Sequence, residues 1–319
     1  MPLAAASSEL SQYGPQAIVL SRTAALTLMV TLLLWTWTGA SAAVFGTDDR
    51  QPLPASMQTL AQKIGTLTSL QSGAVCSAFC AAPDVIVTAS HCLFGTAASA
   101  KPDQTRLQFR LGSGGDPDVS ALAATQTGAI GQQILSGTQR LSVTPPIDAA
   151  SDWAVARLEV PVCRAGGLAL SQKSRAEVDA IAQAGGVFEV AVHRDIPFTG
   201  LMLGRPCALP RQFPAADPET IARDFLAPGG VLFHTCDTGG GSSGSPLLID
   251  GPEGPEVIGI NVGTYVLSRM LPRGSGKREI EQSEAIANTA VETAQFAGAV
   301  AKLRLGPPPV AGRNARVTR

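Results

Sequence analysis

The sequence carries little charge for its length, and its positive and negative residues nearly cancel. Only 15% of its 319 residues are Asp, Glu, Lys or Arg, and the formal net charge is -1. A protein that binds nucleic acid or an acidic membrane surface usually needs an excess of positive charge. The composition therefore excludes nucleic acid and, apart from export, membranes as partners.

Histidines are also few, and the cysteines lack the spacing of a metal site. The chain has three histidines and six cysteines, with no Cys-x-x-Cys pair and no His-x-x-x-His pair. Pairs of this kind supply the ligands of most structural zinc sites. We therefore expect no bound metal and no cofactor.

Hydrophobic residues and turn-forming residues are abundant. Hydrophobic residues make up 45% of the chain, which also contains 33 glycines and 23 prolines. This composition favours many short strands joined by turns around a large core, and it is not typical of a helical bundle or a disordered chain. We predict an all-β globular protein.

The first 42 residues have the layout of an export signal. Arg22 precedes an apolar run at 24–35, and Ala40-Ser41-Ala42 fits the small-residue rule of signal peptidase. We expect residues 1–42 to be removed, Ala43 to begin a mature chain with little or no propeptide, and the protein to be secreted or periplasmic. The alternative is an uncleaved anchor, although the run is shorter than the roughly 20 residues of a spanning helix.

The segment from Gly241 to Pro246, Gly-Ser-Ser-Gly-Ser-Pro, predicts a tight turn that exposes a serine. Glycines let the backbone adopt unusual angles and bring amide hydrogens close to a substrate carbonyl. Ser243 is the candidate nucleophile, and Ser242 and Ser245 are the alternative hydroxyls. Taken alone, a Gly/Ser run is equally typical of a loop or linker.

Two further positions offer a base and an acid. His91 follows the apolar run 85–88, where a strand ends and a side chain can face a cleft. Asp152 precedes the alternating run 153–158, so it can be buried at the mouth of a strand. A serine nucleophile needs an imidazole to take its proton and a buried carboxylate to orient that imidazole. Nucleophilic catalysis by Ser243 is therefore the prediction.

Other residues compete for these roles. Asp148 lies just upstream of Asp152, but no strand follows it directly. Of the two remaining histidines, we expect His193 in a charged surface loop and His234 on a strand that leads towards the serine loop.

The segments Thr-Ala-Ser-His-Cys, Asp-Trp-Ala-Val-Ala-Arg-Leu and Gly-Ser-Ser-Gly-Ser-Pro, in this order, resemble those of trypsin-like serine peptidases with the chymotrypsin fold. The resemblance leans towards the bacterial branch that includes glutamyl endopeptidases and spans about residues 44–304. It extends to residues 44–50, which look like a mature amino terminus, and to 257–263, which look like a pocket strand. It implies a monomeric secreted endopeptidase that cleaves protein or peptide substrates through an acyl-enzyme.

The resemblance implies two six-stranded antiparallel β-barrels and a C-terminal helix. We expect the first barrel at 43–165 and the second at 166–284. The capping-box pattern that begins at Thr289 supports a helix within 285–305, packed on the second barrel, and 306–319 is expected to be a disordered tail. Strands are predicted at 75–79, 85–89, 107–111, 130–135, 153–158, 187–192, 230–233, 246–249 and 257–262, with a helical segment at 56–64.

Carried over by position, the resemblance implies that His91, Asp152 and Ser243 form a catalytic triad. The amides of Gly241 and Ser243 would then form the oxyanion hole. Four residues become candidates for substrate binding: Asp237, Thr238, Asn261 and Gly263.

The candidate pocket residues point in different directions. Asp237 lies six residues before Ser243, the spacing at which trypsin-like members of the family keep the carboxylate that attracts basic P1 side chains. Asp237-Thr238 also resembles the branch with a pocket for glutamate, yet Asn261 replaces the pocket histidine of that branch. The P1 preference therefore stays open.

Six cysteines in an exported chain permit three disulfides, with 15 possible pairings. Cys76–Cys92 matches the family bridge that closes the histidine loop. Cys207 and Cys236 both belong to the expected second barrel and form a second pair, which leaves Cys80 and Cys163 by elimination.

Two other functions remain as alternatives. The chain can be a catalytically silent secreted binding module on a peptidase scaffold. An α/β-hydrolase esterase would instead need a histidine after its nucleophile, and no histidine follows Ser243.

Overall fold

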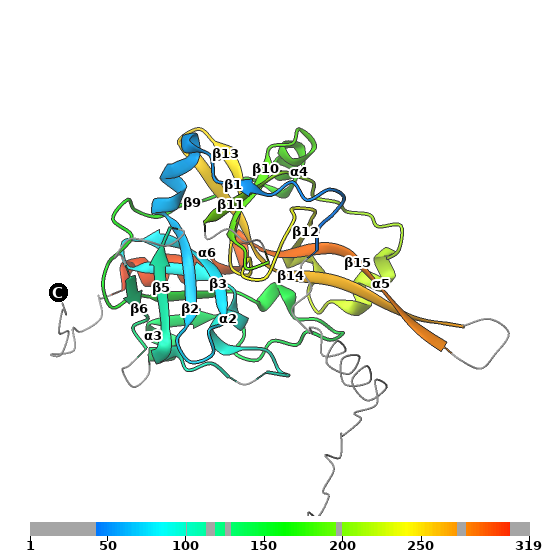
Figure 1. Cartoon of the computed structure of the whole chain (residues 1–319), viewed down its shortest axis with the longest axis horizontal. Helices are drawn as coiled ribbons and strands as arrows, with labels where there is room; N and C mark the ends of the chain where they lie inside the picture. The colour runs from blue at the N-terminus through cyan, green and yellow to red at the C-terminus, as the bar shows by residue number, and fades with distance from the viewer. Residues whose placement is uncertain are drawn as a thin grey trace, which may run out of the picture. The chain divides into compact units, whose positions relative to one another are not determined.

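The structure, a computed structural model, describes residues 43–99, 101–112, 119–124, 129–195, 200–272 and 279–306. Two sheets, both almost entirely antiparallel, form the framework of the described structure (Figure 1). The expected signal segment and nearly all of the expected tail lie outside these ranges.

The first sheet is built from apolar strands that all lie before residue 160. Its seven strands follow the order β6-β5-β2-β3-β4-β8-β7. A bridge between Leu122 and Leu158 joins the β6 end to β8, so the sheet curls into a barrel. The strands are β2 (Ile64–Ser69), β3 (Val75–Ala82), β4 (Val85–Thr88), β5 (Leu107–Leu111), β6 (Val119–Ala121), β7 (Ile134–Ser136) and β8 (Ala154–Arg157).

The second sheet has eight strands among the described residues, in the order β1-β11-β10-β13-β14-β15-β12 with β9 beside β14. The Thr235 N–H donates to the Ala208 carbonyl at 3.1 Å, which joins the chain after β12 to the chain after β11. The strands are β1 (Gln51–Pro52), β9 (Ala169–Leu170), β10 (Val187–Val192), β11 (Leu201–Cys207), β12 (Val231–His234), β13 (Pro246–Gly251), β14 (Gly254–Pro272) and β15 (Glu279–Glu292).

Short helices connect the strands, and a longer one, α6, follows the last strand. Phe296, Val300 and Leu303 of α6 are buried at helical spacing in the apolar cluster that runs through both barrels. The helices are η1 (Ala55–Gln62), α2 (Ser90–Phe94), η2 (Gln104–Arg106), α3 (Ala129–Gln132), η3 (Ala149–Ser151), α4 (Arg175–Gln183), α5 (Pro218–Asp224), η4 (Pro228–Gly230) and α6 (Thr293–Leu305).

The structure confirms the two-barrel fold with a C-terminal helix and corrects several details. The sheets contain seven and eight strands where six each were expected. The helix begins at Thr293, because β15 continues to Glu292 in register with β14, and Thr289 is a strand residue and no helix cap. Helix α6 contacts β4, β7 and β8 of the first barrel as well as β14 and β15 of the second.

Three further expectations change near the barrel edges. The segment expected to be helical at 56–64 is a 3-10 helix that ends at Gln62, and Ile64 already begins β2. The strand expected at 130–135 begins only at Ile134. Strand β1 pairs with β11, so the start of the region assigned to the first barrel belongs to the second sheet.

All three expected disulfides are present. The Cα atoms lie 6.2 Å apart in Cys76–Cys92, 5.9 Å apart in Cys80–Cys163 and 4.7 Å apart in Cys207–Cys236, all within the range of a disulfide. Cys80–Cys163 joins β3 to the chain after β8. In the part of the chain that the structure describes, no helix has both the length and the hydropathy to cross a membrane.

Candidate active site

Two adjacent strands of the first barrel bring His91 and Asp152 together. Strand β4 pairs with β8, and His91 lies in α2 just after β4, while Asp152 lies just before β8. One Asp152 carboxylate oxygen, Oδ2, lies 2.7 Å from His91 Nδ1, and the other accepts the His91 backbone N–H at 2.9 Å. Asp148 makes neither contact. The bond to the carboxylate places a proton on Nδ1 and leaves Nε2 free to accept one.

Burial and charge act in opposite directions on the His91 ring. Burial by itself lowers the pKa of His91, and the attraction and hydrogen bond of Asp152 outweigh it, so the pKa lies above its ordinary value of 6.5. The Asp152 side chain is 1% exposed, whereas the His91 side chain keeps 20% exposure. The arrangement stabilises a protonated imidazole at a site that remains open to solvent.

The serine loop of the second barrel packs against the first barrel. The Ser77 N–H of β3 donates to the Ser243 carbonyl at 2.8 Å. Gly244 has a φ of +85°, and a Cβ there would lie 2.2 Å from Thr88 Oγ1. Only glycine permits both this backbone angle and this close approach. The contact places Ser243 beside Thr88, the last residue of β4, which His91 follows three residues later.

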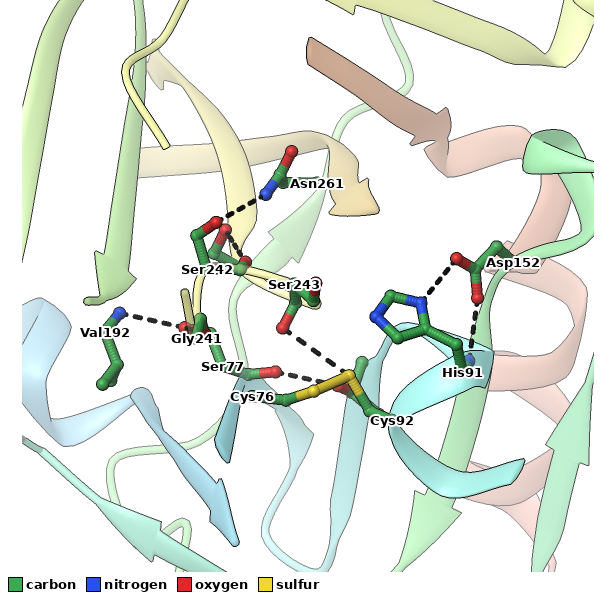
Figure 2. The surroundings of a disulfide bond; sticks show 12 residues. Cys76, Ser77, His91, Cys92, Asp152, Val192, Gly241, Ser242, Ser243 and Asn261 are labelled. Carbon is green, nitrogen blue, oxygen red and sulfur yellow. Dashed lines mark hydrogen bonds and ion pairs between the residues drawn. A yellow bond between two sulfur atoms is a disulfide. The ribbon is translucent and has the colours of Figure 1, made fainter. Parts of the chain in front are cut away.

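Figure 2 shows the His91 ring between Asp152 and Ser243, with one ring nitrogen towards each. Among the described residues, the Ser243 hydroxyl has no hydrogen-bond partner, so it is not committed to another group. The structure thus brings the three predicted residues to one place. The Cys76–Cys92 disulfide beside them ties α2 to β3 (Figure 2).

The backbone before Ser243 is held so that two amides stay free. The Gly240 carbonyl accepts the Arg194 N–H at 2.6 Å, and the Ser242 carbonyl accepts the Ser245 N–H at 2.9 Å. In a trans peptide the N–H points away from the preceding carbonyl. The amides of Gly241 and Ser243 therefore point away from these bonds, and neither donates to another residue in the described part of the chain.

Comparison with solved structures gives a matching fold. A structure of a Glu endopeptidase in complex with MPD superposes with a TM-score of 0.52 at 15% identity, and the match covers 81% of this chain and 100% of that one. The chain has the chymotrypsin fold. No protein-family model and no curated protein matches the sequence.

In this chymotrypsin fold, Ser77 links the two barrels, a role that the sequence patterns did not predict. Its hydroxyl accepts the Val192 N–H at 2.9 Å and donates to the Gly241 carbonyl at 2.9 Å. Ser77 is completely buried, directly after Cys76 in an otherwise apolar strand. A polar residue in such a strand is the signal that would have found it.

A second missed feature is a set of polar side chains beneath the serine loop. The Asn261 side chain contacts two polar residues. Its Oδ1 lies 3.1 Å from His234 Nε2, and its Nδ2 donates to Ser242 Oγ at 3.0 Å. Ser245 donates to the Glu189 carboxyl group. These buried side chains bind Ser242 and Ser245 on the two sides of Ser243. The sequence signal for them was a glutamate within the apolar strand β10.

Burial keeps Glu189 and His234 uncharged near neutral pH. Burial raises the pKa of Glu189 to about 8 and lowers the pKa of His234 to about 4. Together with Cys236 they form one of two groups of possible metal ligands among the described residues; the other is Cys76, His91 and Cys92. Both groups include disulfide-bonded cysteines, which have no thiolate to offer, so neither fits a metal.

The four candidate substrate-binding residues are mostly interior. Asp237 and Thr238 are each 3% exposed and Asn261 is 1% exposed, whereas Gly263 is partly exposed. The Asp237 carboxylate accepts the N–H groups of Phe45 and Asp49 at 2.7 and 3.0 Å. It is therefore already engaged by the chain's own backbone, which removes the argument for a basic P1 residue. The amide of Asn261 is likewise engaged by His234 and Ser242.

The other two histidines are both interior. His234 lies on β12, as expected. His193 was expected on a charged surface, but it is 4% exposed and its Nδ1 lies 3.1 Å from Arg50 Nη1. The partner of the ring, Arg50, lies 143 residues away along the chain, so the local sequence does not reveal the contact.

Proposed function

We propose that this chain is an exported serine endopeptidase that cleaves protein or peptide substrates, with Ser243 as nucleophile. The observation that carries the proposal is the position of His91 between the buried Asp152 and Ser243. The fold shared with a Glu endopeptidase structure supports the same class of reaction. Three disulfides support an oxidising compartment outside the cytosol, in line with the export signal predicted at residues 1–42.

The reaction follows from the positions of the three groups. His91 Nε2 takes the proton of Ser243 as its oxygen attacks the substrate carbonyl carbon, and Asp152 stabilises the imidazolium that forms. The imidazolium then gives this proton to the leaving amine, and an acyl-enzyme remains. Water, activated by the same histidine, hydrolyses the ester and restores Ser243. No hydrogen bond joins the Ser243 hydroxyl to His91 among the described residues, and bonds of this kind often tighten only when substrate is bound.

The amides of Gly241 and Ser243 would stabilise the oxyanion of the tetrahedral intermediate. Both are free of partners within the described residues and are oriented by the bonds at Gly240 and Ser242. A donor of this kind typically contributes about 3 to 4 kcal/mol of transition-state stabilisation. This contribution does not depend on which side chain occupies the P1 pocket.

Labelling with a fluorophosphonate probe tests the proposal. We expect the purified wild-type protein to be labelled, because the probe forms a covalent bond with an activated serine hydroxyl. Ser243→Ala should abolish labelling, and the matched control Ser72→Ala, at an exposed turn, should leave it unchanged. Cleavage of casein measured in parallel should follow the same pattern.

Two outcomes would contradict the proposal. Equal labelling of the wild type and Ser243→Ala would move the nucleophile to another residue. A folded wild type that is neither labelled nor proteolytic would favour the silent binding module.

A further inference from the structure

Arg50 is a buried cation between the start of the described chain and the serine loop. Its side chain is 3% exposed, and its Nη2 lies 2.7 Å from Asp48 Oδ2 and 2.9 Å from Asp195 Oδ2. Its Nη1 lies 3.1 Å from Nδ1 of His193. Burying a guanidinium is costly unless it is paired, so these contacts fix its position. Arg50 thereby joins two segments that are 145 residues apart.

The chain on the amino-terminal side of Arg50 is bound to the beginning of the serine loop. The Asp237 carboxylate accepts the N–H groups of Phe45 and Asp49. The Thr238 N–H donates to the Ala43 carbonyl at 3.0 Å. Residues 43–50, which we call the N-terminal brace, therefore lie along the segment that leads to Ser243.

The Arg50–Asp195 ion pair packs directly on Gly239. A Cβ at this position would lie 1.9 Å from Asp195 Oδ1 and 2.6 Å from Arg50 Nη1. The loop backbone therefore contacts the ion pair without an intervening side chain. A change in the position of the pair changes the surface on which Gly239 rests.

The same ion pair holds the segment whose amide orients the proposed oxyanion hole. Arg194, next to Asp195, donates its backbone N–H to the Gly240 carbonyl at 2.6 Å. That bond sets the orientation of the following amide, Gly241 N–H, because the two groups belong to one planar peptide. Each step from Arg50 to Gly241 is thus a direct contact.

We propose that Arg50 is a positioning residue of the proposed peptidase, which through Asp195 and the Arg194 amide orients the Gly241 N–H towards the oxyanion. This inference rests on the proposed function. Arg50 touches neither substrate nor the triad. Its effect is therefore on the step that generates the oxyanion and only weakly on substrate binding.

Steady-state kinetics of Arg50→Met and Asp195→Asn on a peptide substrate test the proposal, with concentrations set by active-site titration. Loss of one oxyanion donor costs about 10²- to 10³-fold in kcat, so a misoriented donor should cost about 10- to 100-fold. We expect this loss in kcat for Arg50→Met, a smaller loss for Asp195→Asn, and KM within about threefold of wild type in both. Arg50→Lys should restore part of kcat.

The control is Arg205→Met, which removes an arginine paired with Asp250 on the surface of the same barrel. It should have wild-type kcat. A kcat within twofold of wild type in folded Arg50→Met would overturn the proposal, as would a loss confined to KM. If Arg50→Met does not fold, Asp195→Asn decides in the same way, because this aspartate is 34% exposed.

Hydrogen exchange separates failure of this proposal from failure of the proposed function. In the Ser243→Ala background, where no catalysis is needed, Arg50→Met should speed amide exchange in peptides that cover residues 237–243. Unchanged exchange would overturn the positioning role even in an active enzyme. Faster exchange in this background, combined with a folded wild type that no fluorophosphonate labels, would retain the brace and reject the peptidase assignment.

Discussion

In the first barrel, His91 and Asp152 are held by paired strand ends and by a disulfide next to the histidine, whereas Ser243 in the second barrel lies on a loop supported by polar side chains. The first support consists of the β4–β8 ladder and the Cys76–Cys92 bond. The second includes Glu189, His234 and Asn261, all buried. The first half is held by backbone pairing and a covalent bond, whereas the second also depends on hydrogen bonds of side chains that can change protonation.

This difference predicts where the molecule responds to pH. In the first barrel, Asp152 favours the charged form of His91, which would form when His91 takes the Ser243 proton in the proposed reaction. In the second barrel, burial favours the neutral forms of Glu189 and His234. The folded state of the serine half is therefore weakened as pH rises towards 8, where Glu189 ionises, and as pH falls towards 4, where His234 gains a proton.

The largest effect is expected from Asp152→Asn, which tests the first barrel. The amide cannot accept both the His91 backbone N–H and the Nδ1–H, so it favours the wrong tautomer. We expect kcat to fall by roughly 10³- to 10⁴-fold with little change in the unfolding midpoint. Asp250→Asn, at a 60% exposed position of the second barrel, is the control and should match wild type. A loss below tenfold would show that Asp152 does not orient the histidine.

A smaller effect is expected from removing disulfides, which compares the two barrels directly. Cys80–Cys163 closes a separation of 83 residues in the first barrel, and Cys207–Cys236 closes 29 in the second. Loop entropy predicts losses of about 4.5 and 3.6 kcal/mol for the paired alanine variants. Guanidinium unfolding of both variants measures the order. A reversed order would mean that the second barrel depends more on its covalent bond than on its polar contacts.

The smallest effect is expected from Glu189→Gln, which keeps the shape of the neutral carboxyl. Because folding raises the pKa of Glu189 from 4.5 to about 8, its stabilising contribution is complete below pH 4.5 and is lost as pH rises to about 8. Between pH 6 and pH 7, wild type should therefore lose up to about 1.4 kcal/mol relative to the variant. Urea unfolding at several pH values measures the difference, with the exposed Glu253→Gln as control. Parallel curves for wild type and Glu189→Gln would place the pH response elsewhere.

The resemblance to a known family predicted the two-barrel fold, and local sequence patterns identified two of the three site residues as lying at strand ends. The apolar run before His91 and the alternation after Asp152 mark strand ends, and the structure has strands there at Val85–Thr88 and Ala154–Arg157. All three cysteine pairings were also predicted correctly. Strand β15 was not predicted as such, since the capping-box pattern at Thr289 suggested a helix and pairing with β14 overrode it.

The pocket and the supports of the loop were decided by contacts between distant segments. Asp237 has the spacing of a pocket acid, yet the backbone of Phe45 and Asp49, almost 200 residues earlier, occupies its carboxylate. His193 was expected on a charged surface, yet it is buried and its ring contacts Arg50. The spacing of a residue from the nucleophile predicts its position along the chain, but it does not predict which distant residues bind its side chain.

The sequence by itself determined the all-β class and the strand ends beside His91 and Asp152, because strand alternation and turn chemistry act over a few neighbouring residues. The cysteine pairing came from the resemblance to a known family and from elimination. Only the tertiary structure decided that residues 43–50 brace the serine loop and that Glu189 and His234 lie beneath it. The burial of such groups depends on which distant segments pack together, and burial in turn sets their charge state. Local sequence patterns do not predict this packing.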